Sequence, residues 1–389
     1  MKICIAAHSA KGFGEFVGGS ERQSALLARE LAARGHDVAY VVAGLAGGDR
    51  LIDGVRVRSA WDPDAGVRIV RAATHRYPRL LGLLREERAD VYYARGAGYY
   101  TPFVMRAAKE AGAVSILALA SDKDLYAASG KVLFKVSDPR LSALIGPVAH
   151  ACFRRWGLRA ADRVAVQNEE QAASCAALGL PHTVLPSIVE PPPAALLGVS
   201  PSRDVVWVGN VFEGRRSKGL DDLAALAALL PEVGFTVVGI LSGESNRPAR
   251  TALEALPNVD LAGSLPHSET QRRLAAHRII VNTSPSEGFS NVMLEGWSVE
   301  RPCVTLAVNP SGLLSGDRLG ICAGGDLQAM AAAVAGLIAE PEAWAAMGRR
   351  AREYVATVHG PEHVAGRFVE LVDELRASRT LGLPGLCYH

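Results

Sequence analysis

The chain has 389 residues, of which 49% are hydrophobic, and a formal net charge of +2. This length and apolar content favour two buried cores, while the nearly balanced charge argues against nucleic acid as a partner. No apolar run is long enough to span a membrane, and six scattered cysteines without C-x-x-C spacing indicate a reduced, cytoplasmic protein.

Strands and helices alternate along the first half of the chain, a pattern typical of parallel sheets. The expected elements are a strand over Ile3–Ala7, a helix over Ser20–Arg34, and strands over Val38–Val42, Val91–Ala94, Ser115–Ala120 and Arg163–Gln167. We interpret the apolar N-terminal run as the first of these strands and not as a signal peptide.

A glycine-rich turn separates the first strand from its helix. Gly18 and Gly19 precede Ser20 and Gln23, whose spacing matches a capping box, so the helix is expected to begin beside the glycines. Glycines let the backbone approach a ligand closely, and a helix N-terminus favours an anion. A phosphate site and a plain capped turn are both compatible with this pattern. His8, which ends the first strand, is expected to be a satisfied core histidine.

Residues 68–85 form a basic, amphipathic segment that contains Pro78. Such a segment could lie on an anionic surface, which would make the protein peripheral to the inner face of a membrane. Pro78 interrupts the pattern, and the acidic residues that follow it dilute the charge. An ordinary surface helix is therefore the preferred interpretation.

A proline-rich segment from Pro186 to Ser202 is expected to link two domains, because its prolines stiffen the chain and remove hydrogen-bond donors. The alternation of strands and helices then starts again. The expected elements are strands over Asp204–Val208, Thr236–Gly239, Asp260–Gly263, Ile279–Asn282 and Cys303–Ala307, and a helix over Leu220–Leu230.

Two chemical motifs lie in this second half. Lys218-Gly219 ends a basic loop, which is either an ordinary solvated surface or a source of cations for a phosphate. Glu287 and Glu295 bracket a turn and the start of a helix, which Ser290 or Asn291 can cap. A strand, a small-residue turn and a helix direct backbone N–H groups at an anion. On spacing alone, two ordinary surface acids are at least as good an interpretation of the glutamates.

In order along the chain, these motifs resemble the retaining nucleotide-sugar glycosyltransferases of family 4, which have the GT-B fold. The resemblance runs from Gly18-Gly19-Ser-Glu21 to Pro302-Cys-Val304, and Glu287 to Glu295 matches the family's E-x7-E motif. It implies an α/β protein with two Rossmann-like domains that face each other across a cleft. Residues 1–190 would bind the acceptor and residues 191–360 the donor, and a C-terminal helix at 361–380 is expected to pack on the first domain.

The resemblance also implies roles for single residues. Lys218 would stabilise the leaving phosphate, Glu287 would accept hydrogen bonds from the donor sugar, and Glu295 would bind the ribose. The family usually has an arginine where this chain has Asn210, so a second phosphate cation would have to come from Arg215 or, as we prefer, Arg216. The implied donor-binding set is Gly18, Gly19, Arg216, Lys218, Glu287, Gly288, Phe289, Ser290, Asn291 and Glu295.

The acceptor side is less specified by the sequence. Asp122 is the candidate for acceptor contact or proton handling, and an ordinary loop acid is an equal alternative. The D-x-D pairs Asp62-Pro-Asp64 and Asp122-Lys-Asp124 are expected by chance, and GT-B relatives need no metal ion, so we assign neither metal nor cofactor.

The resemblance therefore implies transfer of a sugar, with retention of anomeric configuration, from a nucleotide-diphosphate-sugar to a glycan, lipid or small-molecule acceptor. Another GT-B chemistry, such as epimerisation or phosphorolysis, is a rival within enzymes. The alternative from another class is a catalytically silent protein that keeps the fold and binds a nucleotide-sugar or a partner. Asn210 is the residue that keeps this alternative open.

Overall fold

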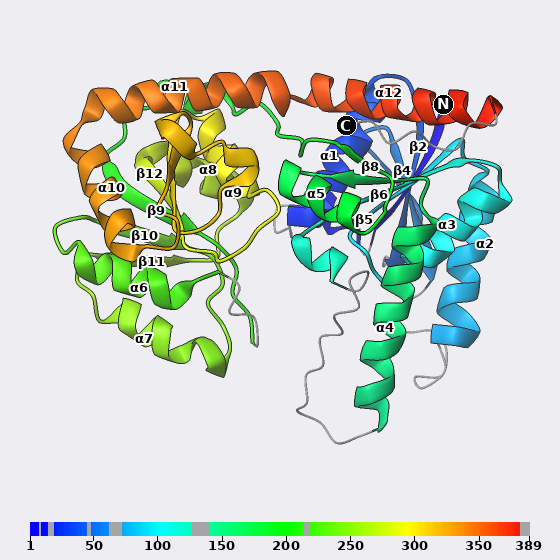
Figure 1. Ribbon diagram of the computed structural model, residues 1–389, viewed down its shortest axis with the longest axis horizontal. Helices are drawn as coiled ribbons and strands as arrows, with labels where there is room; N and C mark the ends of the chain where they lie inside the picture. Colours follow the sequence, from blue (N-terminus) through cyan, green and yellow to red (C-terminus); the bar gives the residue numbers. More distant parts are fainter. Residues whose placement is uncertain are drawn as a thin grey trace. The chain divides into compact units, whose positions relative to one another are not determined.

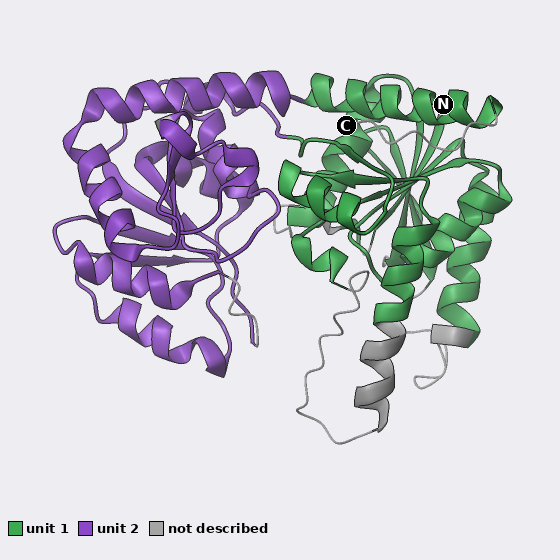
Figure 2. Ribbon diagram, in the orientation of Figure 1, with its two compact units in different colours: residues 1–188, 361–389 green, residues 189–360 purple. Residues whose placement is uncertain are grey.

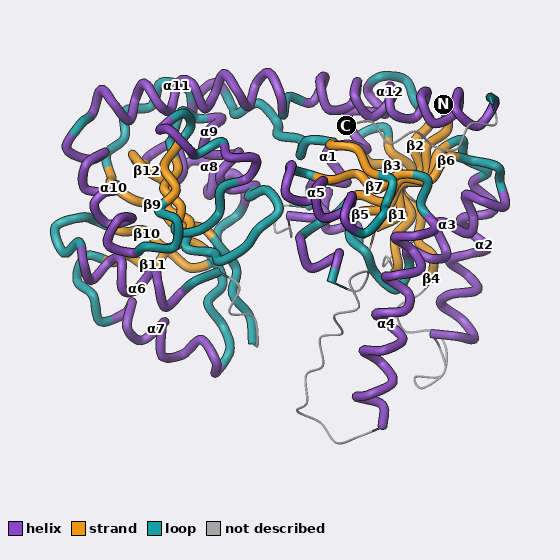
Figure 3. The backbone as a smooth tube through the Cα atoms, viewed as in Figure 1, coloured by secondary structure: helices purple, strands orange, loops and turns teal. Residues whose placement is uncertain are grey.

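The computed structural model describes residues 1–7, 9–14, 19–44, 48–61, 72–126, 141–213 and 218–381. The chain divides into two compact units, one made of residues 1–188 with 361–389 and the other of residues 189–360 (Figure 2). Each unit has a sheet of mainly parallel strands with helices on both faces (Figures 1 and 3). The prediction of an α/β protein with two parallel-sheet domains is confirmed.

The described part of unit 1 contains an eight-stranded sheet in the order β3-β4-β2-β1-β5-β6-β7-β8. Its strands are β1 Lys2–Ala7, β2 Asp37–Gly44, β3 Arg50–Ile52, β4 Val55–Trp61, β5 Val91–Arg95, β6 Val114–Ala118, β7 Arg163–Val166 and β8 His182–Val184. Only β3 runs antiparallel to its neighbour, through a two-residue turn at Asp53 and Gly54, which have φ of 49° and 76°. Two successive positive φ angles are the requirement of a type I′ hairpin turn.

Apolar side chains cover both faces of this sheet, as a parallel sheet requires. Along β1, Ile3 and Ile5 face one core, and Cys4 and Ala6 face the other. The first core is closed by α1 (Gly19–Ala33) and α12 (Pro361–Thr380), where Phe368 packs edge-to-face on Tyr93 at 5.7 Å between ring centroids. The second is closed by α2 (Tyr77–Glu87), α3 (Thr101–Glu110), α4 (Leu141–Ala160) and α5 (Glu169–Ala177).

The basic segment around Pro78 differs from the expectation. Pro78 lies in the first turn of α2, which directly follows a short π-helix over Ala72–Arg76, so helical structure is present on both sides of the proline. The leucines Leu80, Leu81, Leu83 and Leu84 are buried in the core of unit 1. The apolar face of this part of the segment is therefore used within the protein, while residues 62–71 lie outside the described part. No helix among the described residues is both long enough and apolar enough to cross a bilayer.

Unit 2 has a parallel six-stranded sheet in the order β11-β10-β9-β12-β13-β14 in its described part. The strands are β9 Arg203–Val208, β10 Phe235–Val238, β11 Val259–Gly263, β12 His277–Asn282, β13 Cys303–Thr305 and β14 Gly320–Cys322. One face packs on α6 (Leu220–Leu229), α7 (Arg247–Glu254) and α10 (Leu327–Ala339). The other packs on α8 (His267–Ala276), α9 (Asn291–Ser298) and α11 (Pro341–Val358).

The strand order places one topological switch point in each sheet. In unit 1 the strands β2 to β4 lie on one side of β1, and the strands β5 to β8 lie on its other side. In unit 2 the strands β10 and β11 lie on one side of β9, and the strands β12 to β14 lie on its other side. In open α/β sheets, ligands bind beyond the carboxyl ends of the strands at such a point. The loops that follow these four strands are therefore the first places to look for function.

Candidate functional site

Two charged side chains meet at the switch point of unit 2. Lys218 follows β9 in the chain and Glu287 follows β12, and the lysine Nζ lies 2.5 Å from Oε1 of the glutamate. The side chains are 32% and 13% exposed, respectively. Both residues were predicted from the sequence as catalytic candidates, and the structure brings them into direct contact.

Glu287 is held as a carboxylate. Burial opposes its ionisation, but the charge and hydrogen bond of Lys218 and the hydroxyls of Ser284 and Ser290 outweigh this, so the pKa of Glu287 lies below its ordinary value. Ser284 donates its hydroxyl to the same Oε1 at 2.6 Å. A carboxylate has about four acceptor positions, so these bonds leave capacity for a ligand hydroxyl. Ser284 was missed by sequence reasoning, although it stands just after the strand.

The position of Lys218 depends on its neighbour Gly219. Gly219 has a φ of 60°, and a Cβ at this residue would collide with the carbonyl oxygen of Thr283. Thr283 also donates its hydroxyl to the carbonyl of Lys218 at 2.9 Å and accepts the indole N–H of Trp207 at 3.2 Å. The Lys218-Gly219 step is thus fixed against the ends of β9 and β12, and glycine is required for the close approach.

The second glutamate lies further into α9. Ser290 caps this helix, accepting the backbone N–H of Met293, so the prediction of a cap at Ser290 or Asn291 is confirmed with Ser290 as the residue. Phe289 is buried, with its ring 5.0 Å from that of His359. Glu295 is 15% exposed, and its Oε1 lies 4.0 Å from Nδ1 of His267, the first residue of α8. His267 is a neighbour of the proposed ribose site that the sequence did not indicate.

Asn210, which replaces the expected arginine, has a structural contact of its own. Its side-chain oxygen accepts the backbone N–H of Ile240 at 2.8 Å and so joins the loops that follow β9 and β10. Arg215 and Arg216, proposed as substitutes, lie outside the described residues, as do Gly18 and His8. The predictions for these four residues remain predictions.

The predicted capping box of α1 is wrong. The helix begins at Gly19, so Ser20 lies within it. The side chain of Gln23 makes two hydrogen bonds to the main chain of Ile188, donating to its carbonyl at 2.8 Å and accepting its N–H at 2.7 Å. This contact between residues distant in the chain, rather than a local cap, accounts for the buried glutamine.

Asp122 begins a short 3-10 helix (Asp122–Leu125) after β6, at the carboxyl edge of the unit 1 sheet. Its Oδ1 accepts the side-chain amide of Gln171 at 2.9 Å. Asp124 is buried, accepts the backbone N–H of Ala120 at 2.7 Å and pairs with Arg154. Asp124 is therefore structural, while Asp122 stays at an edge where a ligand could be bound. Among the described residues, no three His, Cys, Asp or Glu side chains gather as a metal site.

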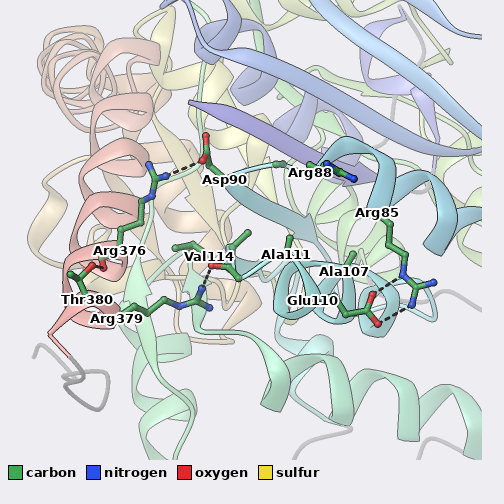
Figure 4. Close-up of a pocket in the computed structure, with 13 residues that line it drawn as sticks. Arg85, Arg88, Asp90, Ala107, Glu110, Ala111, Val114, Arg376, Arg379 and Thr380 are labelled. Atoms are coloured by element: carbon green, nitrogen blue, oxygen red, sulfur yellow. Dashed lines mark hydrogen bonds and ion pairs between the residues drawn. The ribbon is translucent and has the colours of Figure 1, made fainter.

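A groove of about 600 Å³ lies elsewhere in unit 1, at the amino ends of β5 and β6 and beside α12 (Figure 4). Its arginines are mostly neutralised. Arg85 pairs with Glu110, Arg376 with Asp90, and Arg379 with Asp162. Asp162 itself does not line the groove. Because this groove is at the opposite ends of the strands from the switch point, we do not assign the function to it.

Comparison with known proteins agrees with this geometry. Residues 18–187 match the family model of the glycosyl transferase 4-like domain, and residues 202–340 match that of glycosyl transferases group 1. No curated protein matches the sequence.

Solved structures share the fold at low sequence identity. A sucrose-phosphate synthase from Thermosynechococcus elongatus is 18% identical, with a TM-score of 0.73, over 97% of this chain and 99% of its own. HepE from Anabaena, in complex with UDP and glucose, is 16% identical, with a TM-score of 0.65, over 96% and 99%. A glycosyltransferase from Rickettsia africae is 12% identical, with a TM-score of 0.66, over 96% and 98%. These likenesses establish the GT-B fold.

Proposed function

We propose that this chain, which belongs to the glycosyltransferases through its adjacent 4-like and group 1 domains, transfers a sugar from a nucleoside-diphosphate sugar to an acceptor with retention of configuration. The observation that carries the proposal is the contact between Lys218 and Glu287 at the switch point of unit 2. Residues 191–360 would hold the donor, and residues 1–190 the acceptor.

In this mechanism the bond between the anomeric carbon and the β-phosphate oxygen breaks, and the acceptor oxygen forms its bond on the same face of the sugar. The acceptor proton passes to the departing phosphate, so no protein nucleophile is needed. Negative charge develops on that phosphate, and a fixed cation stabilises it. Lys218 would supply this cation, because Glu287 and the Thr283 contact already hold it in place.

The remaining donor contacts are part of the same proposal. The N-terminus of α9 and the backbone around Gly288 to Asn291 would receive phosphate or sugar oxygens, since the first turn of a helix presents unpaired N–H groups. Glu287 would accept a sugar hydroxyl with its remaining capacity, and Glu295 would accept the two ribose hydroxyls. Gly18, Gly19 and Arg216 would complete the phosphate contacts, and Asp122 the acceptor contacts.

The experiment that tests this function is a panel of UDP-, GDP- and ADP-sugars. A donor that binds the folded protein raises its melting temperature by mass action. UDP-sugars come first, because the similar HepE structure contains UDP. NMR of the anomeric proton in the product, or in the hydrolysed donor, then tests retention. Absence of any thermal response to the whole panel would overturn the proposal.

A catalytically silent nucleotide-sugar-binding protein is the second candidate. It is favoured by Asn210, whose side-chain oxygen is tied to Ile240 and supplies no charge to a phosphate. Donor binding without transfer or hydrolysis, over a range of acceptors, would support this candidate over the first.

A further inference from the structure

Arg95 is a buried cation without a counter-charge in the described part of the chain. It is the last residue of β5, and the residue is only 9% exposed. Within the described residues its guanidinium makes one hydrogen bond, from Nη2 to the hydroxyl of Ser187 at 3.4 Å, and its Nε has no partner. None of the described carboxylates pairs with it.

Three other arginines in the described part of the chain are compensated more fully. Arg301, 4% exposed, donates to the carbonyl oxygens of Ala275 at 2.7 Å and Val199 at 2.5 Å. In the groove of Figure 4, Arg85 and Arg376 each face a carboxylate. Removing a guanidinium from water is strongly unfavourable unless charges or hydrogen bonds replace the lost hydration. At Arg95 a single long hydrogen bond to a neutral hydroxyl provides this compensation, which indicates a site for an anion.

Its place in the fold supports the same conclusion independently. β5 and β1 flank the switch point of unit 1, and Arg95 is at the carboxyl end of β5, where ligands of such sheets bind. The side chain that its guanidinium contacts, Ser187, is neutral and polar. Gln167 donates its amide to the hydroxyl of Ser187 at 3.0 Å, the same hydroxyl that Arg95 contacts.

We propose that Arg95 binds an anionic group, a phosphate or a carboxylate, on the acceptor of the transfer reaction. This inference rests on the proposed function, because it takes unit 2 as the donor site and unit 1 as the acceptor site. Guanidinium and either anion form a planar pair of parallel hydrogen bonds, so both anions fit the same residue. An acceptor without a charged group would leave Arg95 uncompensated.

The test uses the full chain, saturated with UDP, and three sugar probes. Glucose 6-phosphate carries a phosphate, glucuronate a carboxylate, and glucose neither. At least one anionic sugar is expected to raise the melting temperature of the wild type in a dose-dependent way, and glucose is not. By calorimetry, Arg95→Gln should bind that sugar roughly tenfold to a hundredfold more weakly, the range for a hydrogen bond to a charged group. Which anionic sugar responds tells phosphate from carboxylate.

Two controls make the result specific. Arg88→Gln removes an exposed cation at the opposite ends of the strands and should bind both UDP and the anionic sugar as the wild type does. Arg95→Gln without ligand should be at least as stable as the wild type, since it removes an uncompensated buried charge. A clear loss of stability in this variant would show that Arg95 is structural and would overturn the proposal.

Failure of this inference is separate from failure of the proposed function. If UDP does not bind the wild type, the proposed function fails. If UDP binds but neither anionic sugar raises the melting temperature, the acceptor assignment alone is wrong. If Arg95→Gln weakens UDP binding as much as sugar binding, Arg95 serves the donor phosphates, and the assignment to the acceptor is again overturned.

Discussion

The carbonyl oxygen of Thr283 occupies the space that a Cβ on Gly219 would need. Gly219 also has a positive φ of 60°, so two independent constraints act on one residue. Because Gly219 directly follows Lys218, a displacement at this point is expected to shift the ammonium group relative to Glu287. The local packing of a glycine therefore controls the placement of the charge that the proposed chemistry needs.

Gly219→Ala should destabilise unit 2 and weaken UDP binding together. The matched control is Gly198→Ala. Gly198 has a φ of 70°, but no atom lies within 4 Å of the Cβ that the substitution adds, so this variant has the backbone strain without the collision. The strain is of the order of 1 kcal/mol, and the additional loss in Gly219→Ala measures the collision with Thr283. Thermal melts and UDP titrations of both variants provide the measurement. If both variants lost the same stability, the carbonyl of Thr283 would have to move away from the added Cβ at no cost in free energy.

Lys218→Met should lower turnover by about 10²–10³-fold, the scale of losing one electrostatic donor to a transition state. It should also lower the melting temperature, because Glu287 is left buried without its cation. The double variant Lys218→Met/Glu287→Gln should recover stability but not turnover. Lys109→Met, at an exposed lysine of α3, is the control. Wild-type turnover in Lys218→Met would remove the lysine from the mechanism.

Glu295→Gln keeps the shape of the side chain but removes its charge. If Glu295 binds the ribose, donor affinity should fall by about 1.5–3 kcal/mol, the range for hydrogen bonds to a charged group. Free UDP should also become a weaker competitive inhibitor of the variant, by a similar factor. Calorimetry on this variant, with Glu342→Gln on an exposed part of α11 as control, provides the test. Unchanged affinity would make Glu295 a structural residue.

His277 predicts a pH dependence of stability. Burial lowers the pKa of this histidine from 6.5 to about 4, and the neutral ring is held between the carbonyl of Arg273 and the hydroxyl of Thr236. Between these two pH values the unfolded chain binds a proton that the folded chain does not. The free energy of unfolding should therefore fall as pH falls from 6.5 to 4, by about 3 kcal/mol in total. Urea titrations across this window measure the change.

The control for that measurement is His277→Asn, which does not titrate. It should be less stable at pH 7, because it packs less well, but its stability should depend less on pH between 6.5 and 4. Glu287 contributes to the pH dependence of stability at a lower pH than His277. Its pKa is depressed, so its stabilising effect is lost only as pH falls below its ordinary value of 4.5. A slope between pH 6.5 and 4 that is the same in His277→Asn would exclude the histidine as its source.

Much of the fold could be predicted because the strands and helices carry strong periodic patterns. The expected strand over Ile3–Ala7 is β1 (Lys2–Ala7), and the expected helix over Leu220–Leu230 is α6 (Leu220–Leu229). The hairpin of β3 and β4 was missed, although Asp53-Gly54 is a strong turn signal. Its first strand spans only Arg50–Ile52, too short to show a period.

The site could be predicted only in part, because strand order and long-range hydrogen bonds are not local properties of a sequence. The motifs indicated that Lys218 and Glu287 follow strands, but not that β9 and β12 are neighbours, which is what brings the two charges together. Gln23 was assigned to a local cap, whereas its partner Ile188 is 165 residues away. Arg95 carries no signal of its own, since only the fold shows that it is buried and without a counter-charge.

The return of α12 to unit 1 sets the order in which the protein can be completed during synthesis. Val364, Phe368, Leu371 and Leu375 of this helix belong to the core that β1 and α1 begin. A ribosome releases residues 1–188 first. Unit 1 nevertheless lacks α12, which covers part of its core, until all of residues 189–360 have been synthesised. Unit 2, which is continuous in the chain, can therefore fold before the unit that precedes it, contrary to the usual N-to-C order. A nascent chain arrested before residue 361 should expose the apolar face around Tyr93 and bind chaperones there.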